Sequence, residues 1–155
     1  TAMEDLSDLK RVVHAHCLAV LAGRIRNAEA GVEDAKESGR SDTKSSAGDK
    51  HETGRAMAQL ELEKRQTVLG HLLDLAHALD GMDPDRQCLR IERGALFRTE
   101  LGLFLVAAAL GRVHAAGLDI MVISTGSPLF LALASMTVGG SREFKGIAYR
   151  LTAIA

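Results

Sequence analysis

The chain has 155 residues, of which 46% are hydrophobic and 25% are charged. This amount of apolar side chain can bury one good core or two small ones, which does not fit a wholly disordered chain. The formal net charge of −1 gives no overall field that would recruit nucleic acid, a membrane or acidic ligands. Any function that depends on charge must therefore be local.

The cysteines and the N-terminus indicate a cytoplasmic location. Cys17 and Cys88 lie far apart within apolar patterns, which suits buried thiols in a reducing compartment better than a disulfide. No basic run followed by an apolar segment opens the chain, so we expect no signal peptide. The longest apolar run, Leu101 to Leu110, is about half the ~20 residues of a membrane span, and we expect a soluble protein.

The first half predicts two long helices. Apolar residues recur at three- and four-residue steps from Glu4 to about Glu37, and again from about Asp49 to Leu79. The polar stretch from Ser38 to Lys50 separates them and predicts a loop, and Gly81 to Pro84 ends the second helix. The seam positions are Leu6, Leu9, Val13, Cys17, Val20, Ala28, Val32 and Ala35, then Ala58, Leu62, Arg65, Leu69, Leu72, Ala76 and Leu79.

Two such helices pack antiparallel, so residues 1–80 predict a coiled-coil hairpin with its tip at residues 38–53. A linker at 81–86 and a second domain at 87–155 follow, where short apolar runs predict strands. The fold class is α+β, a helical hairpin followed by a small antiparallel sheet domain with one short helix. The predicted strands are Cys88–Ile91, Leu103–Leu110 and Leu118–Ser124; the helix is Leu129–Ser135, opened by Ser127 and Pro128; a hairpin turning at Lys145 and Gly146 closes the chain with Ile147–Ile154.

Signatures of a stand-alone enzyme are absent from the sequence. There is no phosphate-binding glycine loop, no Cys-x-x-Cys pair, no His-Glu-x-x-His motif and no nucleophile elbow. The histidine pairs His14/His16 and His71/His77 have spacings that point the rings apart on a helix, which disfavours a metal site.

The predicted tip carries two carboxylates, Asp49 and Glu52. Their spacing matches a capping box at the start of the second helix, a stabilising device worth about 1 kcal/mol. Alternatively, the two carboxylates hold a metal ion. The surrounding cations are either solvated loop charges or groups that steer a phosphate backbone, and they are Arg40, Lys44, Lys50 and Arg55.

Two segments resemble bacterial Gre transcript cleavage factors. The stretch Gly48-Asp49-Lys50-His51-Glu52-Thr53 is similar to the Gly-Asp-x-x-Glu-Asn tip of that family. Far along the chain, Ser127-Pro128-Leu129-x-x-Ala132-Leu133 resembles the Ser-Pro-Leu-Gly-x-Ala-Leu segment of the Gre C-terminal domain.

The resemblance implies a fold and a role. Gre factors combine a coiled-coil hairpin with an FKBP-like C-terminal domain, which docks at the secondary channel of bacterial RNA polymerase; here Ser127, Pro128 and Leu129 would dock. Asp49 and Glu52 would be donated ligands for a Mg²⁺ shared with the polymerase, which then cleaves the 3′ end of backtracked nascent RNA. The protein would be an accessory factor and not itself an enzyme, with no tightly bound cofactor.

The sequence departs from the Gre pattern at three matched positions, which hold Thr53, Phe130 and Gly140. Two alternatives therefore stay open beside cleavage stimulation. One is a Gre-like inhibitor or regulator of the same channel, and the other is a helical-hairpin interaction module whose tip acids only cap the second helix. The seam pattern leaves monomer and weak dimer open, and no membrane partner is expected.

Overall fold

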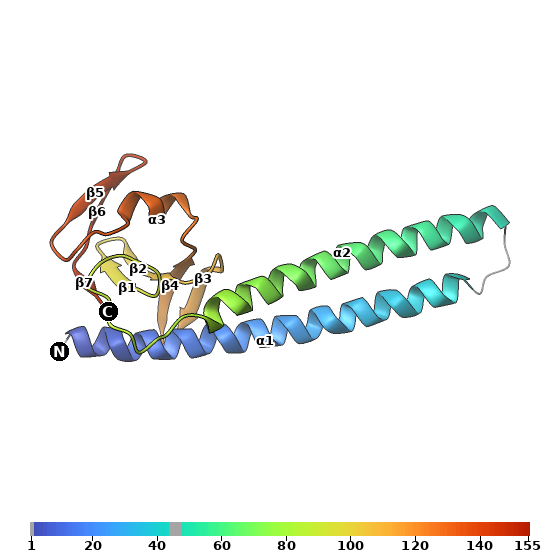
Figure 1. Ribbon diagram of the computed structural model, residues 1–155, viewed down its shortest axis with the longest axis horizontal. Helices are drawn as coiled ribbons and strands as arrows, with labels where there is room; N and C mark the ends of the chain where they lie inside the picture. The colour runs from blue at the N-terminus through green and yellow to red at the C-terminus, as the bar shows by residue number, and fades with distance from the viewer. Residues whose placement is uncertain (1, 44–47) are drawn as a thin grey trace. The chain divides into compact units, whose positions relative to one another are not determined.

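The structure is a computed structural model of the chain, and it describes the backbone of residues 2–43 and 48–155 and the side chains of residues 6–40 and 52–155. The α+β prediction is confirmed: two long helices form a hairpin, and a small, mostly antiparallel sheet with one short helix follows (Figure 1). Two compact units divide these elements. One unit, which we call the sheet unit, comprises residues 1–19 with 77–155, and the other comprises residues 20–76. The start of the first helix thus belongs to the same compact unit as the sheet.

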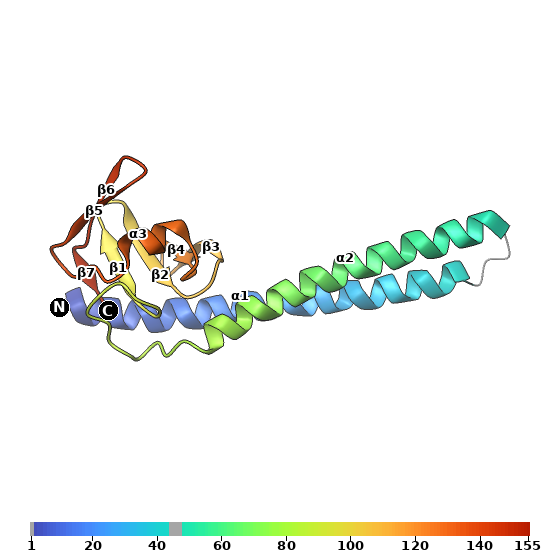
Figure 2. The ribbon, with the colours of Figure 1, turned by 45° about the horizontal axis from the view of Figure 1, so that its top comes forward.

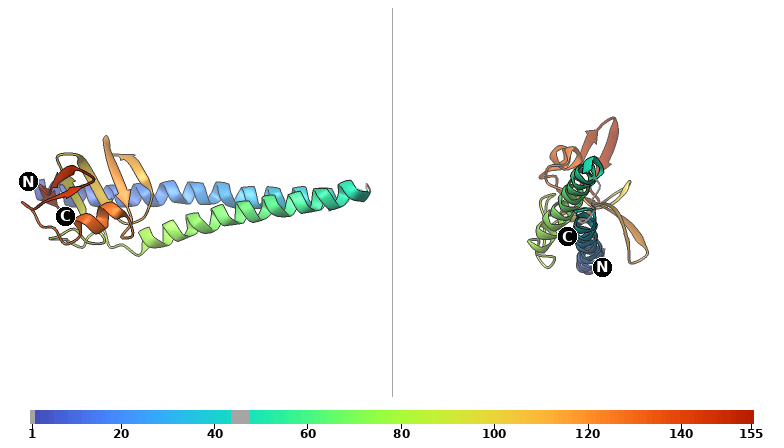
Figure 3. Two further views of the ribbon diagram at one scale, coloured as in Figure 1. Left: turned by 90° about the horizontal axis from the view of Figure 1, so that it is seen from above. Right: turned by 90° about the vertical axis from the view of Figure 1, so that its right-hand side faces the viewer.

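The two long helices are α1 (Ala2–Thr43) and α2 (Gly48–Asp80). Within the unit of residues 20–76 they lie side by side (Figure 3). The predicted loop from Ser38 to Lys50 was too long, because residues 38–43 and 48–50 are helical. A polar stretch without proline can extend a helix that preceding turns have already nucleated, since each further residue adds a backbone hydrogen bond.

The interior seam of α1 differs from the predicted seam near the N-terminus. Leu6, Lys10, Val13 and Cys17 are fully buried, whereas Leu9 is only half-buried. Leu6, Val13 and Cys17 confirm the predicted stripe. Lys10 takes the place predicted for Leu9, because the stripe here is covered by the sheet unit and not only by a partner helix.

The C-terminal elements form a five-stranded sheet and a separate two-stranded ribbon. The sheet has the order β3-β4-β2-β1-β7, in which β2 and β4 are parallel and the other pairs are antiparallel. The ribbon of β5 and β6 projects from the sheet (Figure 2). The bounds are β1 Leu96–Thr99, β2 Gly102–Val106, β3 Gly111–Ala115, β4 Leu118–Ile123, α3 Pro128–Leu133, β5 Ser141–Phe144, β6 Ile147–Arg150 and β7 Ala153–Ile154.

Two strand predictions were wrong in part. Cys88–Ile91 is not a strand, although it makes one isolated bridge between Arg90 and Thr137. Its apolar residues Cys88 and Ile91 are buried in the core from an irregular segment. The run predicted from Leu103 to Leu110 ends as β2 at Val106, and β1 was not among the predicted strands. Burial alone therefore produced an apolar run that looked like a strand.

The closing hairpin was predicted correctly at its turn. Lys145 and Gly146 have φ values of 50° and 78° between β5 and β6. Two consecutive residues with positive φ match the right-handed twist of the flanking strands. The turn therefore sets the register of this ribbon.

One apolar cluster holds the sheet unit together. Phe97 of β1 is fully buried and stacks on Phe104 of β2, with ring centroids 5.2 Å apart and planes 14° apart. Tyr149 of β6 meets the Phe104 ring edge-on at 6.2 Å. The other buried members are Cys88, Ile91, Ala95, Val106, Ile123, Leu133, Met136, Leu151 and Ile154.

Candidate functional site

The tip acids lie at the start of α2. Because α2 begins at Gly48, Asp49 falls within its first turn. The side chains of Asp49 and Lys50, and Lys44 as a whole, lie outside the described residues. Glu52 is exposed, and no hydrogen bond or ion pair joins it to any residue with a described side chain. Its carboxylate is therefore available to an external group.

Half of the predicted capping box lies outside the described residues, because the side chain of Asp49 is not described. A capping box places its first residue just before the helix and bonds the second side chain back to that residue's N–H. For the described half, the Glu52 side chain makes no such bond within the described part of the chain. Both acids still lie where the helix macrodipole favours negative charge. The charge of Glu52 therefore favours α2 through its dipole, while the carboxylate oxygens make no hydrogen bond within the described part of the chain.

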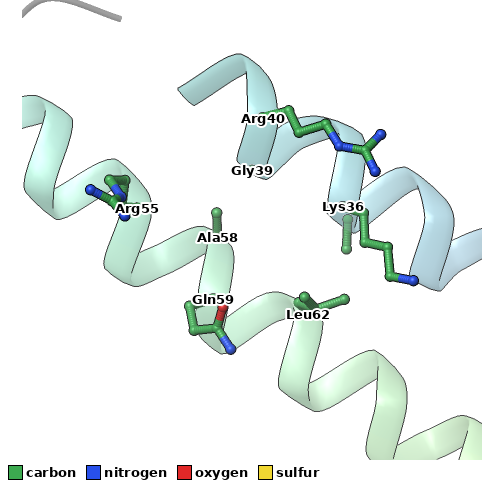
Figure 4. A pocket seen from close by; sticks show the side chains of 8 residues that line it. Lys36, Gly39, Arg40, Arg55, Ala58, Gln59 and Leu62 are labelled. Carbon is green, nitrogen blue, oxygen red and sulfur yellow. The ribbon is translucent and has the colours of Figure 1, made fainter. Parts of the chain in front are cut away.

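A groove lies between α1 and α2, within the unit of residues 20–76 (Figure 4). Its volume is about 290 Å³. Small side chains shape it, since a Cβ added to Gly39 would lie 3.7 Å from the Cβ of Ala58. Ala58 points from α2 toward α1 (Figure 4). The lining residues are Ala35, Lys36, Gly39 and Arg40 from α1 and Arg55, Ala58, Gln59 and Leu62 from α2.

Three cations line this groove. Lys36 pairs with Glu33 at 3.3 Å and Arg40 pairs with Glu37, in both cases one turn back along α1. Arg55 of α2 has no carboxylate partner among the residues whose side chains are described. Exposed ion pairs of this kind contribute less than about 1 kcal/mol, so they can be exchanged for contacts to a phosphate. The groove is suited to bind an anion.

The structure brings two of the four predicted steering residues, Arg40 and Arg55, to one groove. Lys36 was not among the residues predicted from the sequence. The available signal was its spacing, because Lys36 and Arg40 are four residues apart and so lie on the same face of a helix. The predicted loop beginning at Ser38 placed Arg40 outside the helix, so its helical spacing from Lys36 was not considered. In the structure α1 continues to Thr43, so Lys36 and Arg40 lie on one helix.

The predicted docking segment has structural tasks of its own. The Ser127 hydroxyl caps α3 by accepting a hydrogen bond from the Phe130 N–H at 3.1 Å, and Pro128 occupies the first turn. Leu129 and Phe130 pack against the core cluster. Pro128 and Leu131 remain exposed, with Leu131 at 66%. The exposed surface of α3 is therefore formed by Pro128 and Leu131 rather than by all three predicted residues.

Removing the cap is expected to destabilise the sheet unit. Ser127→Ala should lower its free energy of unfolding by about 1 kcal/mol, because the Phe130 N–H loses its acceptor. Urea unfolding followed through the single tyrosine, Tyr149, reports on this unit. Thr125→Ala at a nearby exposed position is the control and should shift stability by less than about 0.5 kcal/mol. Equal effects of the two changes would show that the hydroxyl does not cap α3.

Among residues with described side chains, no three of the types His, Cys, Asp and Glu come together as a metal site. Within the same part of the chain, no helix has the length and apolarity to cross a membrane. Comparison with protein-family models, with curated proteins and with solved structures found no match to this chain.

Proposed function

We propose that the protein is a Gre-type factor of bacterial RNA polymerase, which enters the secondary channel and promotes cleavage of backtracked RNA. The observation that carries this proposal is the exposed carboxylate of Glu52 at the start of α2, which has no partner among the residues with described side chains and lies one turn before Arg55 of a cationic groove. Carboxylate and cation are both supplied by one end of the helical hairpin. The two sequence segments that resemble Gre factors support the same proposal.

The chemistry of the donors suits magnesium. Mg²⁺ prefers oxygen ligands and is usually held by one or two carboxylates together with phosphate oxygens and water. Glu52 meets this requirement because its carboxylate is not engaged by another described group, and Asp49 would be the second donor. When bound, the ion activates water and neutralises charge on the scissile phosphate. This chain would contribute the ligands, whereas the polymerase supplies the remainder of the site.

The groove would act on the RNA backbone. Lys36, Arg40 and Arg55 present positive charge next to the tip acids, and such groups bind phosphate oxygens through charge-assisted hydrogen bonds. The cations would thereby offset repulsion between the RNA and the acidic tip. The groove and the carboxylates therefore have complementary roles.

A second candidate function rests on α2. Met57, Leu60 and Val68 are large apolar side chains that are 67%, 65% and 52% exposed, and their spacing places them on one side of the helix. Such a face is typical of a hairpin that binds another helix. In that case the acids would serve the helix dipole only.

The decisive experiment uses backtracked elongation complexes of bacterial RNA polymerase. Wild-type protein added with Mg²⁺ is expected to shorten the nascent RNA from its 3′ end faster than polymerase alone. Binding to polymerase without shortening would favour a channel inhibitor. No binding to polymerase at all would exclude both channel functions and leave the interaction module.

The groove makes a separate prediction. Arg55→Gln should weaken stimulation of cleavage several-fold and reduce the salt dependence of binding to RNA-containing complexes, because about one phosphate contact is lost. Lys64→Gln removes an exposed charge on the same helix, outside the groove, and is the matched control. The same loss in both variants would mean that general charge, and not the groove, is responsible.

A further inference from the structure

The segment of residues 83–94, which we call the strap, is tied to α1 within the sheet unit. Polar residues on one side of α1 make these ties. Gln87 donates to the Ser7 hydroxyl at 2.7 Å, and Arg11 pairs with Asp85 at 3.3 Å, both in exposed positions. Between them lies Lys10, the one fully buried member of the set.

Lys10 joins the two ends of the strap. Its Nζ donates to the backbone carbonyl of Arg86 at 2.7 Å and to that of Gly94 at 3.0 Å. No carboxylate lies within ion-pair distance of it in the described part of the chain. A lysine buried against two carbonyls without a counter-charge is unusual, since an unpaired buried charge is costly. The two carbonyls accept from two of the N–H groups of this amine.

The surroundings determine the direction in which this amine titrates. Burial lowers the pKa of Lys10 from its ordinary value of 10.5, and the nearby Arg86 guanidinium lowers it further, while Cys88, Asp83 and Asp85 act in the opposite direction. On its own helix, Arg11 and the buried His14 lie one position and one turn away. The loss of water around the amine is the largest of these influences.

We propose that Lys10 is a proton-dependent clasp that holds the strap closed on α1, and that opening of the strap is coupled to proton uptake by this amine. The coupling follows from the change of environment. In the open state the amine is in water and binds its proton with the ordinary pKa, whereas in the closed state it binds the proton less tightly. Between the lowered pKa and 10.5, rising pH therefore favours the closed state. Below that window the amine is protonated in both states, so the free-energy difference between the open and closed states no longer depends on pH.

Cys88 complicates a simple pH scan. Burial raises the pKa of the Cys88 thiol above 9.0, so at alkaline pH the closed state is disfavoured by this group as the open state ionises first. Cys17 behaves in the same way. A comparison between variants at each pH cancels the contribution of Cys17. It does not cancel that of Cys88, because the charge of Lys10 lowers the pKa of this thiol, so every protein compared also carries Cys88→Ala.

Two measurements test the clasp. The first is NMR titration of the lysine Cε and Nζ resonances in the wild-type protein, in which Lys10 should titrate at lower pH than Lys64, an exposed lysine on α2. The second is urea unfolding of wild type, Lys10→Met and Lys64→Met, each carrying Cys88→Ala, at pH 7 and pH 10. It is followed by circular dichroism at 222 nm, because a tyrosine in the unfolded chain ionises near pH 10. Relative to Lys10→Met, the free energy of unfolding of the wild type should be higher at pH 10 than at pH 7. Relative to Lys64→Met, it should not change between the two pH values.

Either of two results would overturn the proposal. One is a Lys10 resonance that titrates together with Lys64, and the other is a stability difference from Lys10→Met that is the same at both pH values. If Lys10→Met does not fold, the wild-type titration still decides, because it requires no substitution. Protection of the strap amides from hydrogen exchange, corrected for the intrinsic rate at each pH, should follow the same titration as Lys10.

Discussion

Replacing Glu52 with glutamine is expected to reduce stimulated RNA cleavage at least about tenfold while leaving binding to polymerase intact. Glutamine keeps the size of the side chain and removes the charge that would make it a donated magnesium ligand. Substitution of a residue that only supports a metal ligand typically lowers metal affinity or activity by about 10- to 100-fold. Substitution of a direct ligand should lower it at least as much. Asp49→Asn should act in the same direction. The readout is the rate of RNA shortening in backtracked complexes at several Mg²⁺ concentrations.

Asp74→Asn supplies the matched control for this test. Asp74 is an exposed carboxylate on the same helix, well away from its first turns. Higher Mg²⁺ should partly rescue Glu52→Gln, since a weakened site fills at higher concentration, and should not affect Asp74→Asn. Full activity of both tip variants would remove the acids from the mechanism. Loss of binding in Glu52→Gln would instead assign the carboxylate to the polymerase interface.

Truncating Phe97 should have the largest effect on stability. Phe97→Ala is expected to lower the free energy of unfolding of the sheet unit by about 3–5 kcal/mol, because it removes a fully buried ring and leaves Phe104 without its stacking partner. Domains of ordinary stability have about 5–15 kcal/mol in total, so a large fraction would be lost. Urea unfolding through Tyr149 measures this change, since Tyr149 contacts Phe104 and the chain has no tryptophan.

The control is Leu101→Ala, at a side chain that is 53% exposed in the same unit. It should change the stability by less than about 0.5 kcal/mol. Circular dichroism at 222 nm, which is dominated by the long helices, provides a second probe. In Phe97→Ala, the helical signal can keep the urea midpoint of the wild type while the Tyr149 signal changes at a lower urea concentration. That result would show that the two units unfold separately. A loss smaller than about 1 kcal/mol would show that the aromatic stack is not the centre of the core.

The sequence was sufficient wherever a local pattern decides the structure. A repeat of three and four residues predicted the two helices, because the burial of one helix face depends only on that period. Ser127 and Pro128 predicted the start of α3, and Lys145 with Gly146 predicted the β5–β6 turn, since caps and tight turns are set by a few neighbouring residues. The two tip acids could also be singled out by position.

Tertiary structure decided the features that depend on residues far apart in the chain. Lys10 is buried only because the carbonyls of Arg86 and Gly94, 76 and 84 residues away, accept from its amine. Strand β1 carries the exposed charge of Arg98 and exists because β2 and β7 pair with it on either side. The groove needs both helices, since Lys36 and Arg40 come from α1 and Arg55 from α2. Local periodicity specifies which face of an element is buried, whereas the identity of the group that covers that face depends on long-range packing.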